Sequence, residues 1–170
     1  TSSIHAGLPT LAVRCPAHPV MRAVLDELAI PVAAPSANAS ETVSPTTPEH
    51  VLATLDGRID AVLDAGASER GLESTIVALR QDGGWSLLRE GPIGREILED
   101  ALGSEASNGR GIEAPGQMRR HYAPGKPLRL NARNAEPGEF LIGFGAIEGD
   151  VTLSATGDVN EAASRLYACL

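Results

Sequence analysis

The sequence predicts an α/β protein, because helical and strand-like patterns alternate along its 170 residues. Hydrophobic residues make up 42% of the chain, a share that disfavours disorder. Domains commonly contain about 100–150 residues, so the length suits one domain and part of another.

The first predicted elements are a strand, a helix and a second strand. Residues 10–13 suit a short strand. Pro16 and Pro19 fit only near the first turn of the helix that follows. The helical spacing comes from four apolar positions, Val20, Val24, Leu25 and Leu28. Residues 30–34 are typical of a buried strand that runs into a polar loop at 35–38.

Signals for a second helix lie just before residue 50. Either Thr46 or Thr47 can cap it, and Pro48 suits its first turn. We expect this helix to run to about Leu55, because Gly57 is a natural stop.

Three strand candidates follow. Residues 59–64 and 74–79 are short apolar runs, and the second run is rich in β-branched residues. Asp82-Gly83-Gly84 is a hairpin-type turn that leads into a third candidate at 85–89. A helix then starts at Gly91-Pro92 and carries its apolar residues on one side, at Ile93, Ile97, Leu98 and Leu102, before Gly103.

A linker separates these elements from a second folded part. Residues 104–126 hold Ser, Asn, Gly, Pro and charged residues without an apolar period. Asp158 with Glu161 caps a last helix, and the strands predicted before it are 128–130, 140–144 and 151–153. The predicted division of the chain is 1–103, 104–126 and 127–170.

Both ends of the chain look abrupt. Strand-like residues appear within ten of Thr1, and residues 127–170 are too few for a complete α/β unit. We therefore expect a chain that is cut inside one domain at its front and inside another at its back.

Charge is distributed unevenly. The formal net charge is −8, and a mostly acidic molecule repels phosphate backbones, which disfavours a broad nucleic-acid footprint. Residues 110–133 are the exception, with six basic side chains and one acidic side chain. Any polyanion contact should concentrate there, although a solvated linker explains the same composition.

Several classes of chemistry lack their motifs. The sequence contains neither GxxxxGK[ST] nor GxSxG, and its four histidines show no metal-ligand spacing. Residues 143–149 miss the GxGxxG spacing by one residue and are better explained as a turn after a strand. Cys15 and Cys169 stand far apart, so they support neither a disulfide framework nor a zinc site. No run approaches the roughly 20 apolar residues of a membrane span, and a cytoplasmic location is predicted.

Small polar residues on predicted loops are the candidates for ligand binding. Hydroxyls in such loops can donate to phosphate oxygens, and backbone N–H groups at a helix start add favourable electrostatics. The candidates are Ser36, Asn38, Ser44, Thr46, Ser74 and Thr75. Arg14 and Arg89 each end a strand-like run, where a guanidinium can bind a carboxylate or a phosphate with two prongs. Ser and Thr also cap helices, and for Thr46 or Thr47 capping is the simpler explanation.

Five motifs occur in one order and together closely resemble the YrdC family of threonylcarbamoyl-AMP synthases. They are PVAAPSANAS at 31–40, SPT at 44–46, LDAG at 63–66, GLESTIV at 71–77 and LLREG at 87–91. The run APGQMRRHYAP at 114–124 resembles the linker of the longer, two-domain members. The likeness covers roughly residues 8–128, and the rest resembles the start of their C-terminal domain.

The resemblance implies a twisted open-sheet α/β domain with a concave cleft, followed by a linker and a smaller Rossmann-like α/β domain. It implies a nucleotidyltransferase that forms threonylcarbamoyl-AMP and diphosphate from L-threonine, bicarbonate and ATP for tRNA modification. Mg²⁺ is expected to accompany ATP. RNA and the threonylcarbamoyl-transfer machinery are further expected partners.

Roles carried over by motif fall on nine positions. The resemblance implies catalytic roles for Ser36 and Asn38, and a threonine pocket of Arg14, Ala34 and Ser74. The ATP-binding residues it implies are Thr10, Ser36, Ser44, Arg89 and Tyr122, the last on a linker that acts as a lid. Ser36 and Asn38 resemble the second half of a signature whose first half is a Lys and an Arg, which we expect upstream of Thr1.

The sequence departs from the family pattern at three places, and two alternative functions remain open. Glu41 stands in place of a common Gly, Glu90 in place of the Pro usual before Gly91, and residues 117–119 in place of Met-Lys-Tyr. The missing upstream basic pair favours a non-catalytic module that binds nucleotide or double-stranded RNA. A carbamoyl-transferring maturation factor with an embedded YrdC-like domain is a third possibility, which the linker motif at 121–124 argues against.

Overall fold

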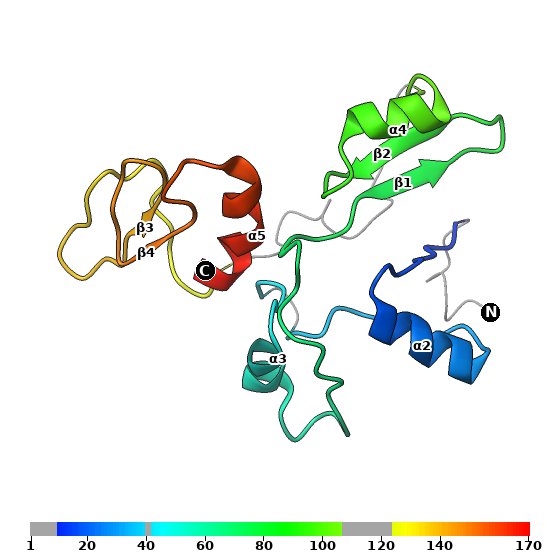
Figure 1. The fold of residues 1–170 in the computed structure, drawn as a ribbon, viewed down its shortest axis with the longest axis horizontal. Coiled ribbons are helices and arrows are strands. Elements are labelled where there is room, and N and C mark those ends of the chain that lie inside the picture. Colours follow the sequence, from blue (N-terminus) through cyan, green and yellow to red (C-terminus); the bar gives the residue numbers. More distant parts are fainter. Residues whose placement is uncertain (1–9, 40–41, 107–123) are drawn as a thin grey trace. The chain divides into compact units, whose positions relative to one another are not determined.

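The computed structural model describes residues 10–39, 42–106 and 124–170. The described residues form four helices and two separate two-stranded sheets, drawn in Figure 1. The chain divides into two compact units, Thr1–Pro35 and Ser36–Leu170. None of the helices in the described ranges is long and apolar enough to cross a membrane.

The first unit contains one helix, α2 (Pro19–Leu28), as the apolar spacing predicts. His18 is its N-cap, with the ring Nδ1 accepting from the backbone N–H of Val20 at 3.3 Å. The strands predicted at 10–13 and 30–34 are wrong, because neither segment is extended in a sheet and both expose their apolar side chains. A strand needs a neighbour to satisfy its backbone groups, and no described residue pairs with either segment.

The second unit opens with α3 (Pro48–Leu55), which has the predicted bounds. Thr47 rather than Thr46 is the N-cap, accepting from the backbone N–H of His50 at 3.4 Å. Residues 59–64 form no strand, so that prediction is wrong as well. Their described surroundings offer no pairing edge, and Asp64 instead accepts from the N–H of Gly66 in a turn.

A hairpin of β1 (Ile76–Leu79) and β2 (Trp85–Arg89) confirms the predicted pairing. Asp82 accepts from the N–H of Gly84 in the turn, as expected for Asp-Gly-Gly. Helix α4 (Arg95–Leu102) follows and begins after the predicted Gly91-Pro92 start. Among the described residues, Trp85 is the one large hydrophobic side chain that is buried, with 1% of its surface exposed. Its Nε1 donates to the carbonyl of Gly103 at 2.9 Å.

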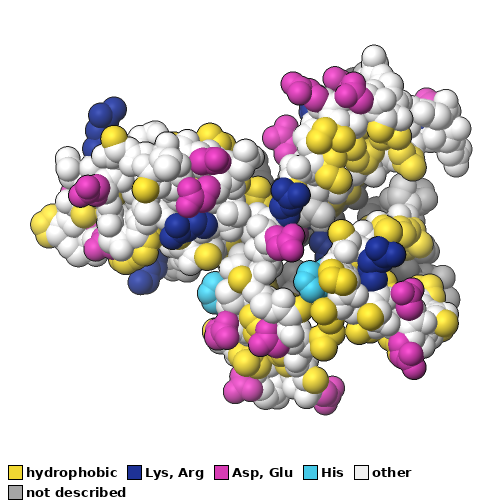
Figure 2. All heavy atoms as spheres, in the orientation of Figure 1, with side chains coloured by type: hydrophobic (Ala, Val, Ile, Leu, Met, Phe, Trp, Pro, Cys, Tyr) yellow, Lys and Arg dark blue, Asp and Glu magenta, His cyan; other side chains and the backbone are white. Residues whose placement is uncertain are grey.

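The chain after α4 runs back beside β2. The backbone N–H of Ala106 donates to the carbonyl of Trp85, and the Glu105 carboxylate accepts from the N–H of Leu87 at 2.7 Å. These contacts satisfy one edge of β2 without another strand. Hydrophobic side chains nevertheless stay exposed on the surface (Figure 2), including Leu79 and Ile97 of this part.

The C-terminal part contains a parallel pair, β3 (Ile142–Gly143) and β4 (Val151–Thr152), and α5 (Val159–Cys169). The strands lie inside the predicted runs, whereas residues 128–130 form no strand and that prediction is wrong. The segment after β3 is a turn, as expected, with the N–H of Ile147 donating to Phe144. Asp158 caps α5 by accepting from the N–H groups of Asn160 and Glu161.

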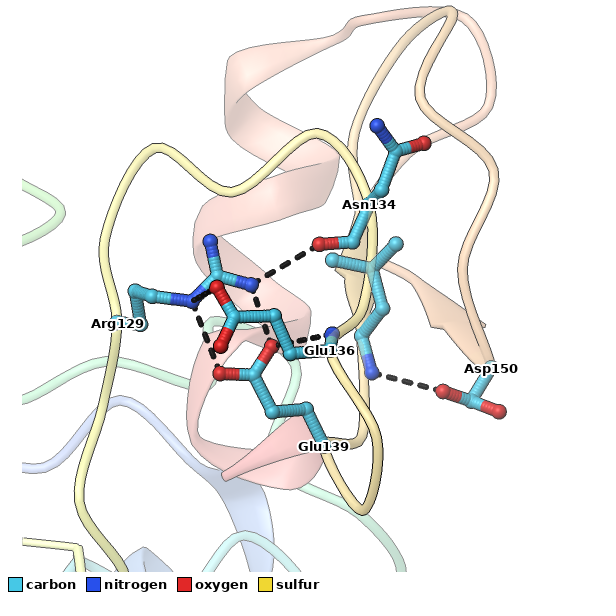
Figure 3. A network of polar contacts seen from close by, with 6 residues as sticks. Arg129, Asn134, Glu136, Glu139 and Asp150 are labelled. Atoms are coloured by element: carbon cyan, nitrogen blue, oxygen red, sulfur yellow. Dashed lines mark hydrogen bonds and ion pairs between the residues drawn. The ribbon is translucent and has the colours of Figure 1, made fainter.

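A polar network shapes the loop that leads into β3 (Figure 3). Arg129 donates from Nε to the Glu139 carboxylate at 2.9 Å and from Nη2 to the carbonyl of Asn134 at 3.0 Å. Arg129 Nη2 also contacts the second carboxylate oxygen of Glu139. The same carboxylate accepts from the backbone N–H of Glu136 at 2.8 Å. This network closes the loop from residue 129 to residue 139.

Candidate functional site

Glu73 lies at the centre of the candidate site. Its Oε1 accepts a hydrogen bond from the hydroxyl of Ser44, and its Oε2 lies 3.3 Å from Nη2 of Arg89. The side chains of Arg89 and Glu73 are only 14% and 19% exposed. One carboxylate therefore connects the segment before α3 with the end of β2.

The hairpin explains why Arg89 meets the segment that enters β1. Antiparallel pairing brings the end of β2 to the beginning of β1, and a register shift between Ile76 and Val77 sets Arg89 opposite Ile76. Arg89 then donates from Nε to the carbonyl of Ser74 at 2.9 Å. Its Nη2 also lies 3.4 Å from the Ser74 hydroxyl. The guanidinium is thus held by two consecutive residues of one segment.

Gly91 allows the chain after β2 to pass directly over this segment. A Cβ at Gly91 would lie 2.3 Å from the backbone nitrogen of Thr75 and 2.5 Å from the carbonyl oxygen of Glu73. The Thr75 hydroxyl fastens the next residues, because it accepts from the N–H of Ile93 and donates to the carbonyl of Ile93. A glycine is required here for close approach rather than for a special backbone angle.

The segment that carries Ser44 is firmly held. Ser44 and Thr46 are 8% and 6% exposed. The Thr46 hydroxyl lies 3.3 Å from Nδ1 of His50, and the Thr46 carbonyl accepts from the N–H of Ser68 at 2.8 Å. Thr46 therefore braces the start of α3 from within, while Thr47 caps it.

Asn38 braces the loop that precedes Ser44. Its side-chain amide donates to the carbonyl and the hydroxyl of Thr42, both at 3.1 Å, and approaches the carbonyl of Val43 at 3.4 Å. Its Oδ1 is a buried polar atom without a hydrogen-bond partner among the described residues. Ser36, the other expected catalytic residue, is exposed.

The structure brings some of the expected residues together within the second unit. Ser44, Ser74 and Arg89 meet around Glu73. Thr10, Arg14 and Ala34 lie exposed in the first unit. Tyr122 lies outside the described residues. Glu73 was not among the expected site residues, although it stands directly before Ser74 in the GLESTIV motif, because no local pattern in the sequence indicates its partners.

The described part of the chain offers no ready metal cage. Within residues 10–39, 42–106 and 124–170, no group of three or more His, Cys, Asp or Glu side chains could hold a metal ion. The site at Glu73 is an arrangement of one arginine, one carboxylate and hydroxyl groups. Such an arrangement can bind and orient an anionic or polar ligand.

Two family models account for nearly all of the chain. The Sua5, YciO and YrdC model, described as "Telomere recombination", matches residues 1–91. A second model, described as "Threonylcarbamoyl-AMP synthase, C-terminal domain", matches residues 93–170.

Curated relatives carry one name. The chain is 40% identical, over 82% of its length, to a threonylcarbamoyl-AMP synthase of Bacillus subtilis, and spans 42% of that protein. It is 33% identical, over 98% of its length, to a threonylcarbamoyl-AMP synthase of Pyrococcus abyssi, and spans 56% of that protein. A third, from Schizosaccharomyces pombe, is 38% identical over 82% of the chain, which spans 37% of it. The chain thus spans about half the length of these relatives or less.

Solved structures agree with the fold. The crystal structure of P. abyssi Sua5 complexed with L-threonine has a TM-score of 0.78 and 29% identity, covering 99% of this chain and 56% of that one. A P. abyssi Sua5 variant, in which a histidine and the following tyrosine are alanines, has a TM-score of 0.74 and 28% identity, covering 100% of this chain and 56% of that one. The predicted α/β fold class is therefore confirmed, and the chain belongs to the Sua5, YciO and YrdC family that its motifs resemble.

Proposed function

We propose that this chain is part of an L-threonylcarbamoyladenylate synthase, a nucleotidyltransferase that uses L-threonine, bicarbonate and ATP. The observation that carries the proposal is the meeting of Ser44, Ser74 and Arg89 around Glu73. Three segments that are distant in the sequence supply these groups. The relatives named threonylcarbamoyl-AMP synthase support the same assignment.

The proposed reaction forms one bond to phosphorus and breaks another. The threonine amine and bicarbonate give a carbamate and water. A carbamate oxygen attacks the α-phosphorus of ATP, and the bond to the departing diphosphate breaks. Attack of one anion on another requires preorganised positive charge and accurate positioning, which are the contributions we assign to the protein.

Threonine binding is assigned to Arg14, Ala34 and Ser74. Arg14 pairs with the substrate carboxylate in this proposal, because a guanidinium binds a carboxylate with two parallel hydrogen bonds. Ala34 and Ser74 shape the pocket. The threonine complex of the P. abyssi relative supports a threonine site in this family.

ATP binding is assigned to Thr10, Ser36, Ser44, Arg89 and Tyr122. Arg89 supplies the positive charge, and Ser36 with Asn38 orients the reacting phosphate. Tyr122 lies in the one His-Tyr pair of the sequence. In one solved structure of the P. abyssi relative, a consecutive histidine and tyrosine are replaced by alanine, which is why we single out this pair. We assign residues 104–126 as a linker that closes over the nucleotide.

Further parts of the proposal concern the surroundings of the reaction. Mg²⁺ is proposed to accompany ATP, where it would offset phosphate charge. The proposed domains are 1–103 and 127–170, on either side of the linker. A cytoplasmic location, and contact with RNA or the tRNA-modifying machinery, complete the proposal.

Diphosphate release tests the proposed function. The full-length protein containing this chain should release diphosphate only when ATP, threonine and bicarbonate are all present, and mass spectrometry should detect threonylcarbamoyl-AMP. Arg14→Ala should raise the threonine requirement by about 10- to 100-fold, because charge-assisted hydrogen bonds are lost. Nucleotide binding without product in the unmodified protein would instead indicate a non-catalytic module.

The same assay separates the contribution of this chain from that of the rest of the protein. The 170 residues alone are expected to make no threonylcarbamoyl-AMP. The physical reason is that Arg14 and Arg89 supply too little positive charge for the triphosphate without the basic pair expected upstream. Equal turnover by the chain alone would contradict this placement of the phosphate site.

A further inference from the structure

Glu73 belongs to no part of the reaction described so far, yet it contacts two of the residues assigned to ATP. Its two carboxylate oxygens serve different partners, Oε1 accepting from Ser44 and Oε2 facing Arg89. Neither partner is a neighbour in the sequence. The question is whether this carboxylate only stabilises the fold or whether it prepares the site.

Stability alone is a weak explanation for the pair. Shielding a carboxylate and a guanidinium to 19% and 14% exposure costs desolvation energy, and such pairs often add little net stability. A fixed guanidinium is useful for binding, however. An arginine that already lies in one orientation loses less conformational freedom when an anion binds to it.

The contacts of Arg89 indicate how the orientation is set. Nε donates to the Ser74 carbonyl at 2.9 Å, and Nη2 faces Glu73 at 3.3 Å and the Ser74 hydroxyl at 3.4 Å. A planar guanidinium that is held at Nε and at Nη2 cannot rotate freely about its last bond. Of these contacts, the one with Glu73 joins two charged groups and is the strongest in a shielded site.

Ser44 is directed by the same carboxylate. A hydroxyl has a single proton to donate, and the proton of Ser44 is directed to Glu73. Toward any third group, the Ser44 oxygen then acts as an acceptor. Removing the carboxylate releases both the arginine plane and the direction of this hydroxyl.

We propose that Glu73 is a positioning residue for nucleotide binding, which fixes the guanidinium plane of Arg89 and the hydroxyl direction of Ser44. The inference rests on the proposed function in assigning Arg89 to ATP. Positioning and charge cancellation predict opposite changes in ATP affinity when Glu73 loses its charge. If Glu73 mainly cancelled the positive charge of Arg89, removing its charge would strengthen ATP binding, whereas loss of positioning weakens ATP binding.

The test compares Glu73→Gln with Glu90→Gln in the full-length protein. Both variants remove one negative charge near Arg89, but Glu90 is exposed, whereas the Glu73 side chain is 19% exposed and lies 3.3 Å from the guanidinium. Glu73→Gln should raise the Kd for ATP, measured by calorimetry, and the KM for ATP by about tenfold, with kcat changed less. Glu90→Gln should leave both constants within about twofold.

An Arg89→Gln background shows whether Glu73 acts through the arginine. There, Glu73→Gln should add less than about twofold to the Kd for ATP, because no guanidinium remains to be positioned. Glu73→Asp, which keeps the charge on a shorter side chain, should recover part of the lost affinity. If Glu73→Gln melts at a lower temperature than Glu90→Gln, Glu73→Asp is compared with Glu90→Gln instead. Glu73→Asp should then still bind ATP more weakly than the unmodified protein.

The outcomes separate this inference from the proposed function. Tighter or unchanged ATP binding by Glu73→Gln overturns positioning even in an active enzyme, as does a full tenfold loss in the Arg89→Gln background. An unmodified protein that binds ATP but makes no adenylate refutes the proposed reaction, while the Glu73 comparison still decides positioning. An unmodified protein that does not bind ATP refutes both.

Discussion

Two arginine–glutamate pairs of this chain differ in exposure and in what they hold together. The side chains of Arg89 and Glu73 are 14% and 19% exposed, whereas those of Arg129 and Glu139 are 43% and 35% exposed. The first pair joins the end of β2 to the segment before β1 and, through Ser44, to the segment before α3. The second pair closes a single loop before β3 (Figure 3).

Two hydrogen bonds join the exposed pair. Arg129 donates from both Nε and Nη2 to the Glu139 carboxylate, which also accepts from the backbone N–H of Glu136. The shielded Glu73 instead divides its oxygens between an arginine and a hydroxyl. The Glu139 carboxylate accepts all of these hydrogen bonds from within one loop. The Glu73 carboxylate contacts side chains from two other segments, Ser44 and Arg89, and so links three segments.

Removing each arginine should give the largest contrast. Arg89→Met is expected to raise the KM for ATP by about 100-fold, because a charge-assisted contact is lost and the Glu73 carboxylate is left without its partner. Arg129→Met should change that KM by less than about twofold. Steady-state diphosphate release by the full-length variants measures both effects, and comparable losses would erase the functional difference between the two pairs.

A methyl group at Gly91 should disturb the shielded site through its backbone. Gly91→Ala places a Cβ 2.3 Å from the nitrogen of Thr75, so the segment that carries Glu73 and Ser74 must move. We expect a loss of about 1–3 kcal/mol in the free energy of unfolding, together with weaker ATP binding. Gly125→Ala is the control for stability alone, since its Cβ would meet nothing within 4 Å. Urea unfolding of the full-length protein compares them, and equal stability would argue against the close approach.

Local signals explain which elements the sequence predicts well. Thr47 with Pro48 defines the start of α3, Asp82-Gly83-Gly84 defines the hairpin, and Asp158 defines the start of α5. Each depends on side chains within a few residues of the backbone groups that they satisfy. The strands predicted at 10–13, 30–34, 59–64 and 128–130 depend on partners distant in the sequence, and apolar character alone does not supply a pairing edge.

The candidate site shows the same limit. Motifs identify Ser44, Ser74 and Arg89 individually, and the structure brings these three together. The residue that joins them, Glu73, was not predicted, because its role arises only when the hairpin sets Arg89 beside it and Ser44 approaches from another segment. A contact between distant segments carries no periodic signal in a single sequence. It becomes visible only with the fold.

Helix caps in the two regions should give a smaller difference. Asp158 accepts from two backbone N–H groups, at 2.7 Å and 3.0 Å, whereas Thr47 accepts from one at 3.4 Å. Asp158→Ala should therefore cost about 1 kcal/mol of unfolding free energy and Thr47→Ala about 0.5 kcal/mol. Chemical denaturation measures both. A larger loss for Thr47→Ala than for Asp158→Ala would mean that Thr47 stabilises the start of α3 by more than its hydrogen bond.

The smallest expected effect is the acid sensitivity of the exposed pair. The hydrogen bond from Arg129, followed by the backbone N–H of Glu136, lowers the pKa of Glu139 from 4.5 to about 2. A carboxyl whose pKa is lower in the folded state stabilises that state above its unfolded pKa. This contribution should decline as the pH falls from about 4.5 through about 2. The amide proton of Glu136 should then be less protected from exchange, relative to the intrinsic exchange rate at each pH.

Carboxyl chemical shifts followed by NMR against pH would measure this pKa directly. In Arg129→Met the pKa of Glu139 should rise, yet stay below 4.5, because the N–H of Glu136 still donates to the carboxylate. In Glu136→Gln it should stay well below 4.5, since that change keeps both the backbone donor and Arg129. High salt should weaken the charge attraction at this exposed pair. A pKa near 4.5 in the unmodified protein would mean that the Arg129 contact does not persist in solution, and the contrast with the shielded pair at Glu73 would then be larger still.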